Sequence, residues 1–159
     1  MSRIILILAL SISALACRDL IGPELSDDIV EKEWDLQGFE QPDGSMRDVG
    51  SVRITLILSA DDTLRGKTYT TEEGFEFWRG FNYRTTYYLG ENGTISAGTP
   101  AWDEYVPSAP SPNRWEEFVR AIKLAESYRL NGSEFTILYD DNWKLVFREY
   151  IAPVEEETD

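Results

Sequence analysis

The chain contains no histidine and only one cysteine among its 159 residues. Without histidine it lacks the commonest general base near neutral pH and the commonest metal ligand. A Ser-His-Asp triad and a histidine-based zinc site are therefore excluded. The single Cys17 can form neither an internal disulfide nor a cysteine-rich metal cluster. The sequence accordingly predicts no catalytic residues, no metal site and no cofactor.

Basic residues are also scarce, with 15 Lys and Arg against 29 Asp and Glu, a formal net charge of -14. Such a surface repels the phosphate backbone of nucleic acids, so we expect no nucleic-acid partner. It repels anionic lipid headgroups in the same way, which argues against membrane adhesion through a basic patch. The acidic charge is typical of a soluble surface.

Aromatic and aliphatic residues, in contrast, are plentiful. The chain is 42% hydrophobic and holds 5 Trp, 8 Tyr and 7 Phe. This content can build the core of one ordinary domain and argues against general disorder.

The N-terminus combines a positive start, Arg3, with an apolar run from Ile4 to Ala16. A membrane-spanning helix needs about 20 residues, so this shorter run fits the central region of a signal peptide. The following Ala14-Leu15-Ala16-Cys17 resembles the lipobox of bacterial lipoproteins, although Ala14 is smaller than the usual residue there. The resemblance implies cleavage before Cys17 and attachment of diacylglycerol to its thiol.

This interpretation divides the N-terminal part into a lipoprotein signal peptide, residues 1–16, and a lipidated N-terminus with a flexible tether, residues 17–32. It places the protein outside the cytoplasm, lipid-anchored in a bacterial cell envelope. Asp19 is the second residue after Cys17, where an aspartate retains lipoproteins in the inner membrane of enteric bacteria. Because this rule differs between lineages, the choice between inner and outer membrane stays open. Two alternatives remain: an ordinary secretory signal with an incidental cysteine, and a buried N-terminal core segment.

The remaining sequence predicts antiparallel strands, loops and one helix. We expect the helix over Arg114 to Glu126, capped by Asn113 with Glu116 three residues later. Its apolar face comprises Trp115, Phe118, Val119, Ile122 and Ala125. Loops are expected at 41–50 and 99–113. Strands are expected over 33–36, 52–58, 64–69, 81–89, 94–96, 128–130, 135–139 and 143–150.

The order of these segments, from Trp34-x-Leu36 through Gly80-Phe81-Asn82-Tyr83 and the helix to Leu145-Val146-Phe147, resembles the META/HslJ domain of small bacterial lipoproteins. The resemblance covers roughly Glu33 to Glu149. It implies an α+β domain over 33–151, a curved antiparallel β-sheet (a partial barrel or roll) covered by one main α-helix, followed by an acidic tail over 152–159.

The resemblance also implies a link to stress tolerance in the envelope and gives no catalytic residues to transfer. The chain departs from the family where Phe81 replaces a cysteine, and only Thr99 remains of a second cysteine-containing segment. A redox role supported by those cysteines therefore cannot be transferred.

Aromatic residues concentrate between positions 78 and 105. Tyr83 and Tyr87 are four residues apart and share one face of a regular strand, whereas Tyr88 faces the other way. An exposed subset of these rings could bind a glycan or small ligand, and the alternative is that they fill the core. The candidate ligand-binding residues are Trp78, Tyr83, Tyr87, Trp102 and Tyr105.

Acidic residues suggest two further kinds of site, one for calcium and one for a hydrolase. Asp61-Asp62 and Asp140-Asp141-Asn142 offer oxygen ligands for Ca²⁺, but hairpin turns explain both. Asp103-Glu104 lies in an aromatic loop and could serve a carboxylate-based hydrolase if a second acid faced it.

The sequence thus predicts a non-enzymatic, membrane-anchored envelope lipoprotein that acts as a binding or stress-tolerance module. Its expected partners are the membrane, through the lipid on Cys17, and an envelope protein or small ligand. The alternatives are a glycan or small-ligand binder using residues 78–105, and a carboxylate-based hydrolase. The oligomeric state stays open.

Overall fold

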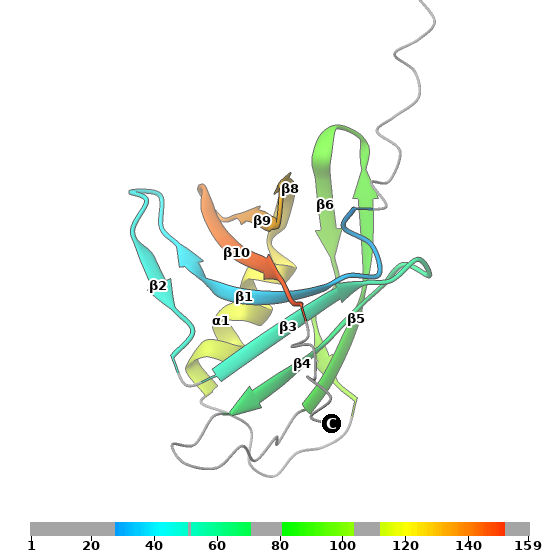
Figure 1. The fold of residues 1–159 in the computed structure, drawn as a ribbon, viewed down its shortest axis with the longest axis horizontal. Coiled ribbons are helices and arrows are strands. Elements are labelled where there is room, and N and C mark those ends of the chain that lie inside the picture. Colours follow the sequence, from blue (N-terminus) through cyan, green and yellow to red (C-terminus); the bar gives the residue numbers. More distant parts are fainter. Residues whose placement is uncertain (1–27, 51, 71–80, 104–111, 152–159) are drawn as a thin grey trace, which may run out of the picture.

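The computed structural model describes residues 28–50, 52–70, 81–103 and 112–151 (Figure 1). The predicted signal peptide, Cys17 with the tether up to residue 27, Trp78, Tyr105 and the acidic tail lie outside the described residues. Within the described ranges, no helix has the length and apolar character needed to cross a membrane.

The described residues form ten strands, a short 3₁₀ turn and one α-helix. In chain order these are β1 (Glu33–Glu40), β2 (Met46–Asp48), β3 (Val52–Leu58), β4 (Thr63–Thr70), β5 (Phe81–Gly90), η1 (Glu91–Gly93), β6 (Thr94–Ala97), β7 (Ala101–Trp102), α1 (Pro112–Lys123), β8 (Ala125–Asn131), β9 (Glu134–Tyr139) and β10 (Trp143–Glu149).

Eight of the strands close into an antiparallel barrel. The hydrogen-bonded order runs β10-β9-β8-β6-β5-β4-β3-β1, and β1 pairs again with β10. The closing pair sets Trp34 opposite Glu149 and Leu36 opposite Phe147, with a bulge between Leu36 and Gly38. The two remaining strands are additions, because β2 pairs with β1 and β7 pairs with β5.

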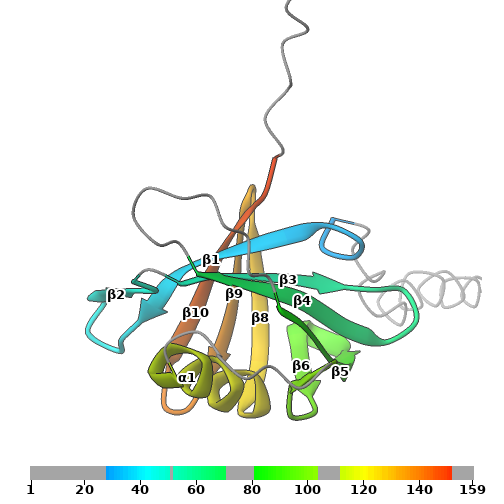
Figure 2. The same ribbon diagram turned by 90° about the horizontal axis from the view of Figure 1, so that it is seen from below.

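The predicted α+β fold is therefore wrong. The domain is mostly β, and its sheet closes on itself instead of forming an open curved layer covered by a main helix. Closure joins the first and last long strands and removes the sheet edges that an open layer would expose. The one α-helix of the described residues is short and lies at one end of the barrel (Figure 2).

Two ion pairs and a buried face hold α1 at that end. Glu117 pairs with Arg47 of β2, and Arg120 pairs with Asp140 in the β9–β10 turn. On the opposite face of the helix, Trp115, Phe118, Ala121 and Ile122 belong to the buried core. The first four residues of the predicted apolar stripe thus pack against the barrel core, whereas the fifth, Ala125, lies in β8.

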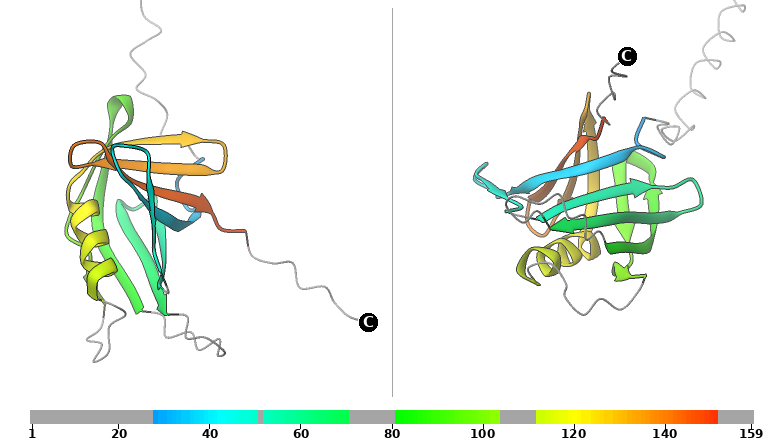
Figure 3. Two further views of the ribbon diagram at one scale, coloured as in Figure 1. Left: turned by 90° about the vertical axis from the view of Figure 1, so that its left-hand side faces the viewer. Right: turned by 60° about the horizontal axis from the view of Figure 1, so that its bottom comes forward.

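Alternating residues of the strands fill the barrel interior. Figure 3 shows how the strands wrap around this interior, as expected of a small barrel that side chains fill. The side chains without exposed surface include Trp34, Phe39, Ile54, Leu56, Leu58, Leu64, Tyr83, Phe118, Phe135, Ile137, Leu145 and Phe147.

The strand predictions agree with the structure apart from their ends and two additions. Strand β2 lies within the expected loop 41–50, and β7 lies within the expected loop 99–113. The helix ends at Lys123, three residues earlier than predicted, because Ala125 already pairs with Tyr139 of β9. Tertiary pairing overrides helix propensity at these positions.

Strands β6 and β7 run along the same edge of β5. Tyr87 pairs with Ala97 of β6, and Tyr83 pairs with Trp102 of β7. On its other side, β6 meets β8 at Thr94 and Ser127. Trp102 of β7 stacks on Trp115 of α1 and so joins this edge of β5 to the helix.

Candidate functional site

An aromatic cluster occupies the end of the barrel nearest the helix. Trp102 and Trp115 stack with ring centroids 4.0 Å apart. Tyr83 meets Trp115 and Phe118 edge-on at 5.1 and 5.4 Å, and Phe81 meets Trp102 at 5.8 Å. These geometries are the favourable ones for aromatic pairs. The cluster therefore joins β5, β7 and α1.

Tyr83 lies at the centre of this cluster and has no exposed surface. Its hydroxyl donates a hydrogen bond of 2.5 Å to the carbonyl oxygen of Thr55 on β3, reaching across β4. Burial raises the pKa of Tyr83 well above its ordinary value, so the hydroxyl stays a donor.

Gly66 of β4 makes room for this contact. A β-carbon at position 66 would lie 2.0 Å from the Thr55 carbonyl oxygen and 2.5 Å from the Tyr83 hydroxyl oxygen. Residue pairs between β3 and β4 lie on either side of this point, Ile54 with Thr68 and Ile57 with Arg65. The hydroxyl of Tyr83 thus gives the Thr55 carbonyl oxygen a hydrogen-bond donor at a point where β3 and β4 are not paired.

Tyr87 lies four residues further along β5 and, like Tyr83, is a buried tyrosine whose hydroxyl bonds a backbone carbonyl. It is 6% exposed, and its hydroxyl donates a hydrogen bond of 2.8 Å to the carbonyl oxygen of Ser59. Burial, followed by the negative charge of Asp62, raises its pKa. The predicted shared face of Tyr83 and Tyr87 is confirmed as the barrel interior, and Tyr88 on the other face is 68% exposed.

Of the five predicted ligand-binding residues, the structure brings Tyr83 and Trp102 together, since they are paired across β5 and β7. Tyr87 lies further along β5, and Trp102 is the one of these three that is only partly buried. Trp78 and Tyr105 lie outside the described residues. Ligand binding by this set stays a prediction.

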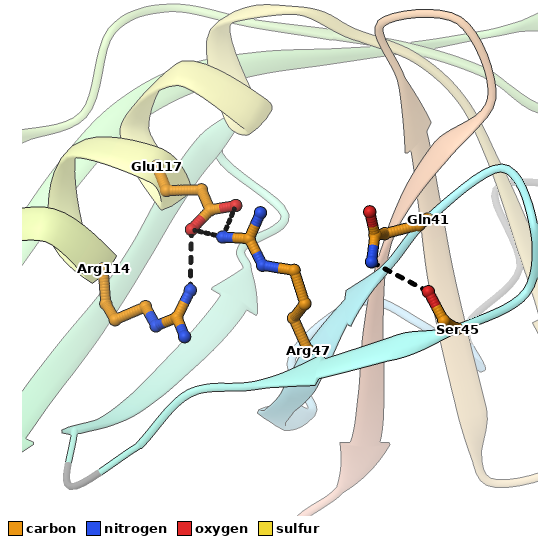
Figure 4. A network of polar contacts seen from close by, with 5 residues as sticks. All are labelled: Gln41, Ser45, Arg47, Arg114 and Glu117. Carbon is orange, nitrogen blue, oxygen red and sulfur yellow. Dashed lines mark hydrogen bonds and ion pairs between the residues drawn. The ribbon is translucent and has the colours of Figure 1, made fainter.

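A polar network borders the outer side of α1 (Figure 4). One guanidinium nitrogen of Arg47 lies 2.6 Å from both oxygens of Glu117, and Arg114 donates to the same carboxylate at 3.0 Å. The Arg47 guanidinium also lies over the ring of Trp143, and that of Arg114 lies over Phe39. Two arginines thus share one carboxylate and fasten α1 to β1, β2 and β10.

The charges of this network affect the pKa of Tyr139, at the end of β9. Its own burial is the first cause that raises its pKa to about 12, and the negative charge of Glu117 is the second. Both effects disfavour the phenolate.

A second arginine site lies on the outer wall. The Nε atom of Arg53 donates to Asp35 at 2.9 Å, and its guanidinium lies 4.3 Å from the ring centroid of Tyr150. Burial is the largest single effect and lowers the pKa of Arg53, but the hydrogen bonds and charges of Asp35 and Tyr150 together outweigh it, so the pKa is raised overall. This contact ties the residue after β10 to β3 across β1, and thereby supports barrel closure.

A hollow of about 560 Å³ opens on the outer wall beside the β3–β4 turn. Two arginines, two hydroxyl residues and three acids line it. Its lining includes Arg65 of β4 and Arg84 of β5, together with Glu31, Ser59, Asp61 and Asp103. A smaller hollow of about 250 Å³ borders Asp35, Val52 and Arg53.

The two acidic segments suggested as calcium ligands form turns. Asp62, Asp140, Asp141 and Asn142 all have positive φ angles, which Asp and Asn tolerate in tight turns. Asp61 accepts a hydrogen bond from the Thr63 amide. Over the part of the chain that the structure describes, no three His, Cys, Asp or Glu side chains are grouped as a metal ion requires.

Asp103, the proposed hydrolase acid, forms an ion pair of 2.8 Å with Arg84, and Glu104 lies outside the described residues. The arginine contacts are the part of this surface that sequence reasoning missed. The Arg114–Glu117 pair has the helical i,i+3 spacing that could have revealed it. The contacts of Arg47, Arg65 and Arg84 depend on strand register and carry no comparable local signal.

Comparison with solved structures gives two similar folds. An NMR structure of a protein from Burkholderia xenovorans matches with a TM-score of 0.55 and 20% identity, covering 79% of this chain and 86% of that one. A crystal structure of a DUF4847 family protein from Bacteroides vulgatus matches with a TM-score of 0.52 and 11% identity, covering 79% and 96%. At these identities the likeness shows a shared barrel fold and nothing about function. No family model and no curated protein sequence matches the chain.

Proposed function

We propose that this protein is a non-enzymatic lipoprotein, anchored to the bacterial cell envelope through Cys17, whose barrel serves as a binding or stress-tolerance module. The apolar run before Cys17 and the small Ala16 support cleavage and lipidation at that position. The complete absence of histidine supports a non-enzymatic role, because it removes the commonest general base.

The observation that carries the proposal is the short stretch of sequence between Cys17 and the first buried residue of the barrel, Ile29. Ile29 is fully buried, and its carbonyl oxygen accepts a hydrogen bond of 3.0 Å from Trp34 Nε1. Only residues 18–28 separate Cys17 from this first core residue. At about 3.3–3.6 Å per extended residue, such a tether holds the domain within roughly 40 Å of a lipid on Cys17.

The decisive experiment is mass spectrometry of the mature protein isolated from bacterial membranes. We expect an N-terminal Cys17 carrying a diacylglycerol and its fatty acids, and a Cys17→Ser chain that no longer fractionates with membranes. A mature chain that retains Met1, or that begins elsewhere with a free thiol, would refute the proposal. The same fractionation, applied to separated inner and outer membranes, assigns the membrane that Asp19 leaves open.

Membership of the META/HslJ family is the finer part of the proposal. The segment order from Trp34 to Phe147 supports it, and a barrel is compatible with it. A stress-tolerance role predicts that deletion of the gene increases sensitivity to heat or envelope-active drugs, and that re-expression of the anchored chain restores tolerance. Normal growth of the deletion strain under these stresses would remove this part of the proposal.

A glycan or small ligand bound by the aromatic region is the second candidate. Trp102 favours it, because its half-buried ring stacks on Trp115 at the helix end of the barrel. Ligand binding there should change tryptophan fluorescence in the parent chain and not in a Trp102→Phe variant. A response that survives this substitution would place the ligand elsewhere.

A further inference from the structure

The hollow beside the β3–β4 turn has the composition of a site and not that of a random charged surface. Arg65 of β4 and Arg84 of β5 are cross-strand partners, so their like charges face each other on the outer wall. Like charges in this position are destabilising, and exposed ion pairs contribute little in return. Fold stability therefore does not account for this arrangement.

Each arginine is already neutralised within the hollow. Glu31 lies 3.5 Å from Arg65, and Asp103 lies 2.8 Å from Arg84. A guanidinium has five N–H donors, and each ion pair uses only a few of them. It likewise uses only some of the lone pairs of the carboxylate. The side chains are thus positioned, and the pairs keep further donors and acceptors for a ligand.

Ser59 supplies a second, independent observation. It borders the hollow and is only 5% exposed, and its hydroxyl oxygen is buried without a hydrogen-bond partner among the described residues. Its backbone groups are occupied, since the amide donates to Thr63 and the carbonyl oxygen accepts from Tyr87. A buried hydroxyl without a partner is costly, and an ordered water or a polar ligand group in the hollow supplies the missing hydrogen bond.

The lining selects the chemical class of that ligand. Ala60 is the one apolar side chain among the lining residues, so an apolar ligand finds no surface to cover. Two arginines against three acids leave a net charge of -1, which repels a polyanion, and the guanidinium groups repel a simple cation. A neutral ligand with many hydroxyl groups, each able to donate and to accept, satisfies both kinds of partner.

We propose that the hollow bordered by Ser59, Arg65, Arg84 and Asp103 binds a saccharide. The site lies on the outer wall and is separate from the aromatic cluster at the helix end. It requires neither lipidation of Cys17 nor the aromatic residues predicted from the sequence, so it stands or falls independently of the proposed anchor.

The test is a titration of the isotope-labelled full chain, held in a polyoxyethylene detergent that carries no sugar, followed by ¹⁵N–¹H NMR. The probes are glucose, galactose, mannose, N-acetylglucosamine and maltose. We expect at least one of them to cause saturable shifts of the Ser59, Ala60, Thr63 and Arg65 amides. The absence of such shifts with all five, or shifts confined to Trp102 and Trp115, would overturn the proposal.

Matched variants decide which groups bind. Arg65→Gln and Arg84→Gln should each weaken binding about tenfold, as expected for loss of a hydrogen bond from a charged donor. Arg129→Gln, an exposed site on β8, is the control and should leave binding unchanged. Equal affinity in all three variants, or saturation of the same amides by phosphocholine and by none of the sugars, would refute a saccharide site.

Discussion

At the scale of single residues, the hydroxyl of Tyr83 is the clearest structural contact in the barrel. Replacing Tyr83 by Phe keeps the ring in the aromatic cluster but leaves the buried Thr55 carbonyl without this donor. We expect a loss of about 1–3 kcal/mol in the free energy of unfolding. Denaturant unfolding followed by fluorescence measures it.

The control for this prediction is Tyr88→Phe on the exposed face of β5, which should change stability by no more than about 0.5 kcal/mol. Equal effects of the two substitutions would show that the Tyr83–Thr55 hydrogen bond contributes nothing specific.

Gly66 provides the space for the same contact. In a Gly66→Ala variant the new methyl group would overlap the Thr55 carbonyl oxygen and the Tyr83 hydroxyl. Overpacking of this kind costs about 1–3 kcal/mol or more, so the midpoint of thermal unfolding should fall. The Tyr83→Phe background removes the hydroxyl oxygen, one of three overlapping atoms, and leaves the Thr55 carbonyl oxygen and the Tyr83 ring carbon Cζ, so there the same substitution should cost less. Strictly additive effects would contradict the shared contact.

Tyr139 makes the stability sensitive to alkaline pH. Its pKa of about 12 in the folded chain exceeds the ordinary value of 10.0, so the folded state holds this proton more tightly than the unfolded state. The resulting stabilisation is complete below about pH 10 and is lost as the pH rises toward about 12. Denaturant midpoints measured from pH 8 to 12 should fall, and less steeply in a Tyr139→Phe variant. Parallel curves for the two chains would contradict this.

Residue-level prediction succeeded where it depended on periodicity alone. The alternation of Tyr83, Tyr87 and Tyr88 followed from the two-residue period of a strand. The acceptors of the two buried hydroxyls could not be predicted, because Thr55 lies on β3 and Ser59 directly after it, both far from β5 in the sequence. Which residue faces the gap at Gly66 depends on register, which a single sequence does not fix in advance.

At the scale of elements, α1 closes one end of the barrel through its apolar face. Phe118 is fully buried and meets Tyr83 and Trp115. Phe118→Ala should lower the free energy of unfolding by about 3–5 kcal/mol, because it removes a buried ring and leaves a cavity. Chemical denaturation measures the loss. Glu116→Ala on the exposed face is the matched control, and a comparable loss there would argue that the helix is stabilised by its own propensity and not by packing.

The helix begins at Pro112, two residues before the predicted start and with the expected cap Asn113 inside it, so its existence and its apolar stripe were the parts predicted from local sequence. Its C-terminal end was not, because Ala125 and Glu126 have helical propensity but lie in β8. Strands β2 and β7 escaped prediction for a related reason. Both are short and exist through pairing with β1 and β5, so their own residues carry little signal.

At the scale of the whole molecule, closure is what the sequence did not reveal. Eight strands with antiparallel hairpins are compatible with an open sheet and with a barrel, and the choice depends on strand tilt and stagger. Here the bulge near Gln37 shifts the register of β1 against β10, and the pairing joins residues more than a hundred positions apart. Such long-range pairing leaves no periodic signature in either strand.

Closure predicts a single cooperative unit. The amides of Trp34 in β1 and Phe147 in β10 should exchange with solvent at the rate set by global unfolding, as the central strands do. Hydrogen exchange followed by NMR compares these amides with those of Ile54 in β3. Faster exchange confined to β1 and β10 would indicate that the barrel opens at its closing pair before it unfolds.

The position of β1 has a mechanical consequence. A tension applied through the N-terminus passes Ile29 and reaches β1, a strand hydrogen-bonded along both sides, to β10 and to β3. A pull along the strand axis then loads many bonds in parallel, as in shear, and does not open them one after another like a zipper. A barrel tethered at this end can resist drag from its surroundings without unravelling, whereas the same force applied to an edge strand would peel it away.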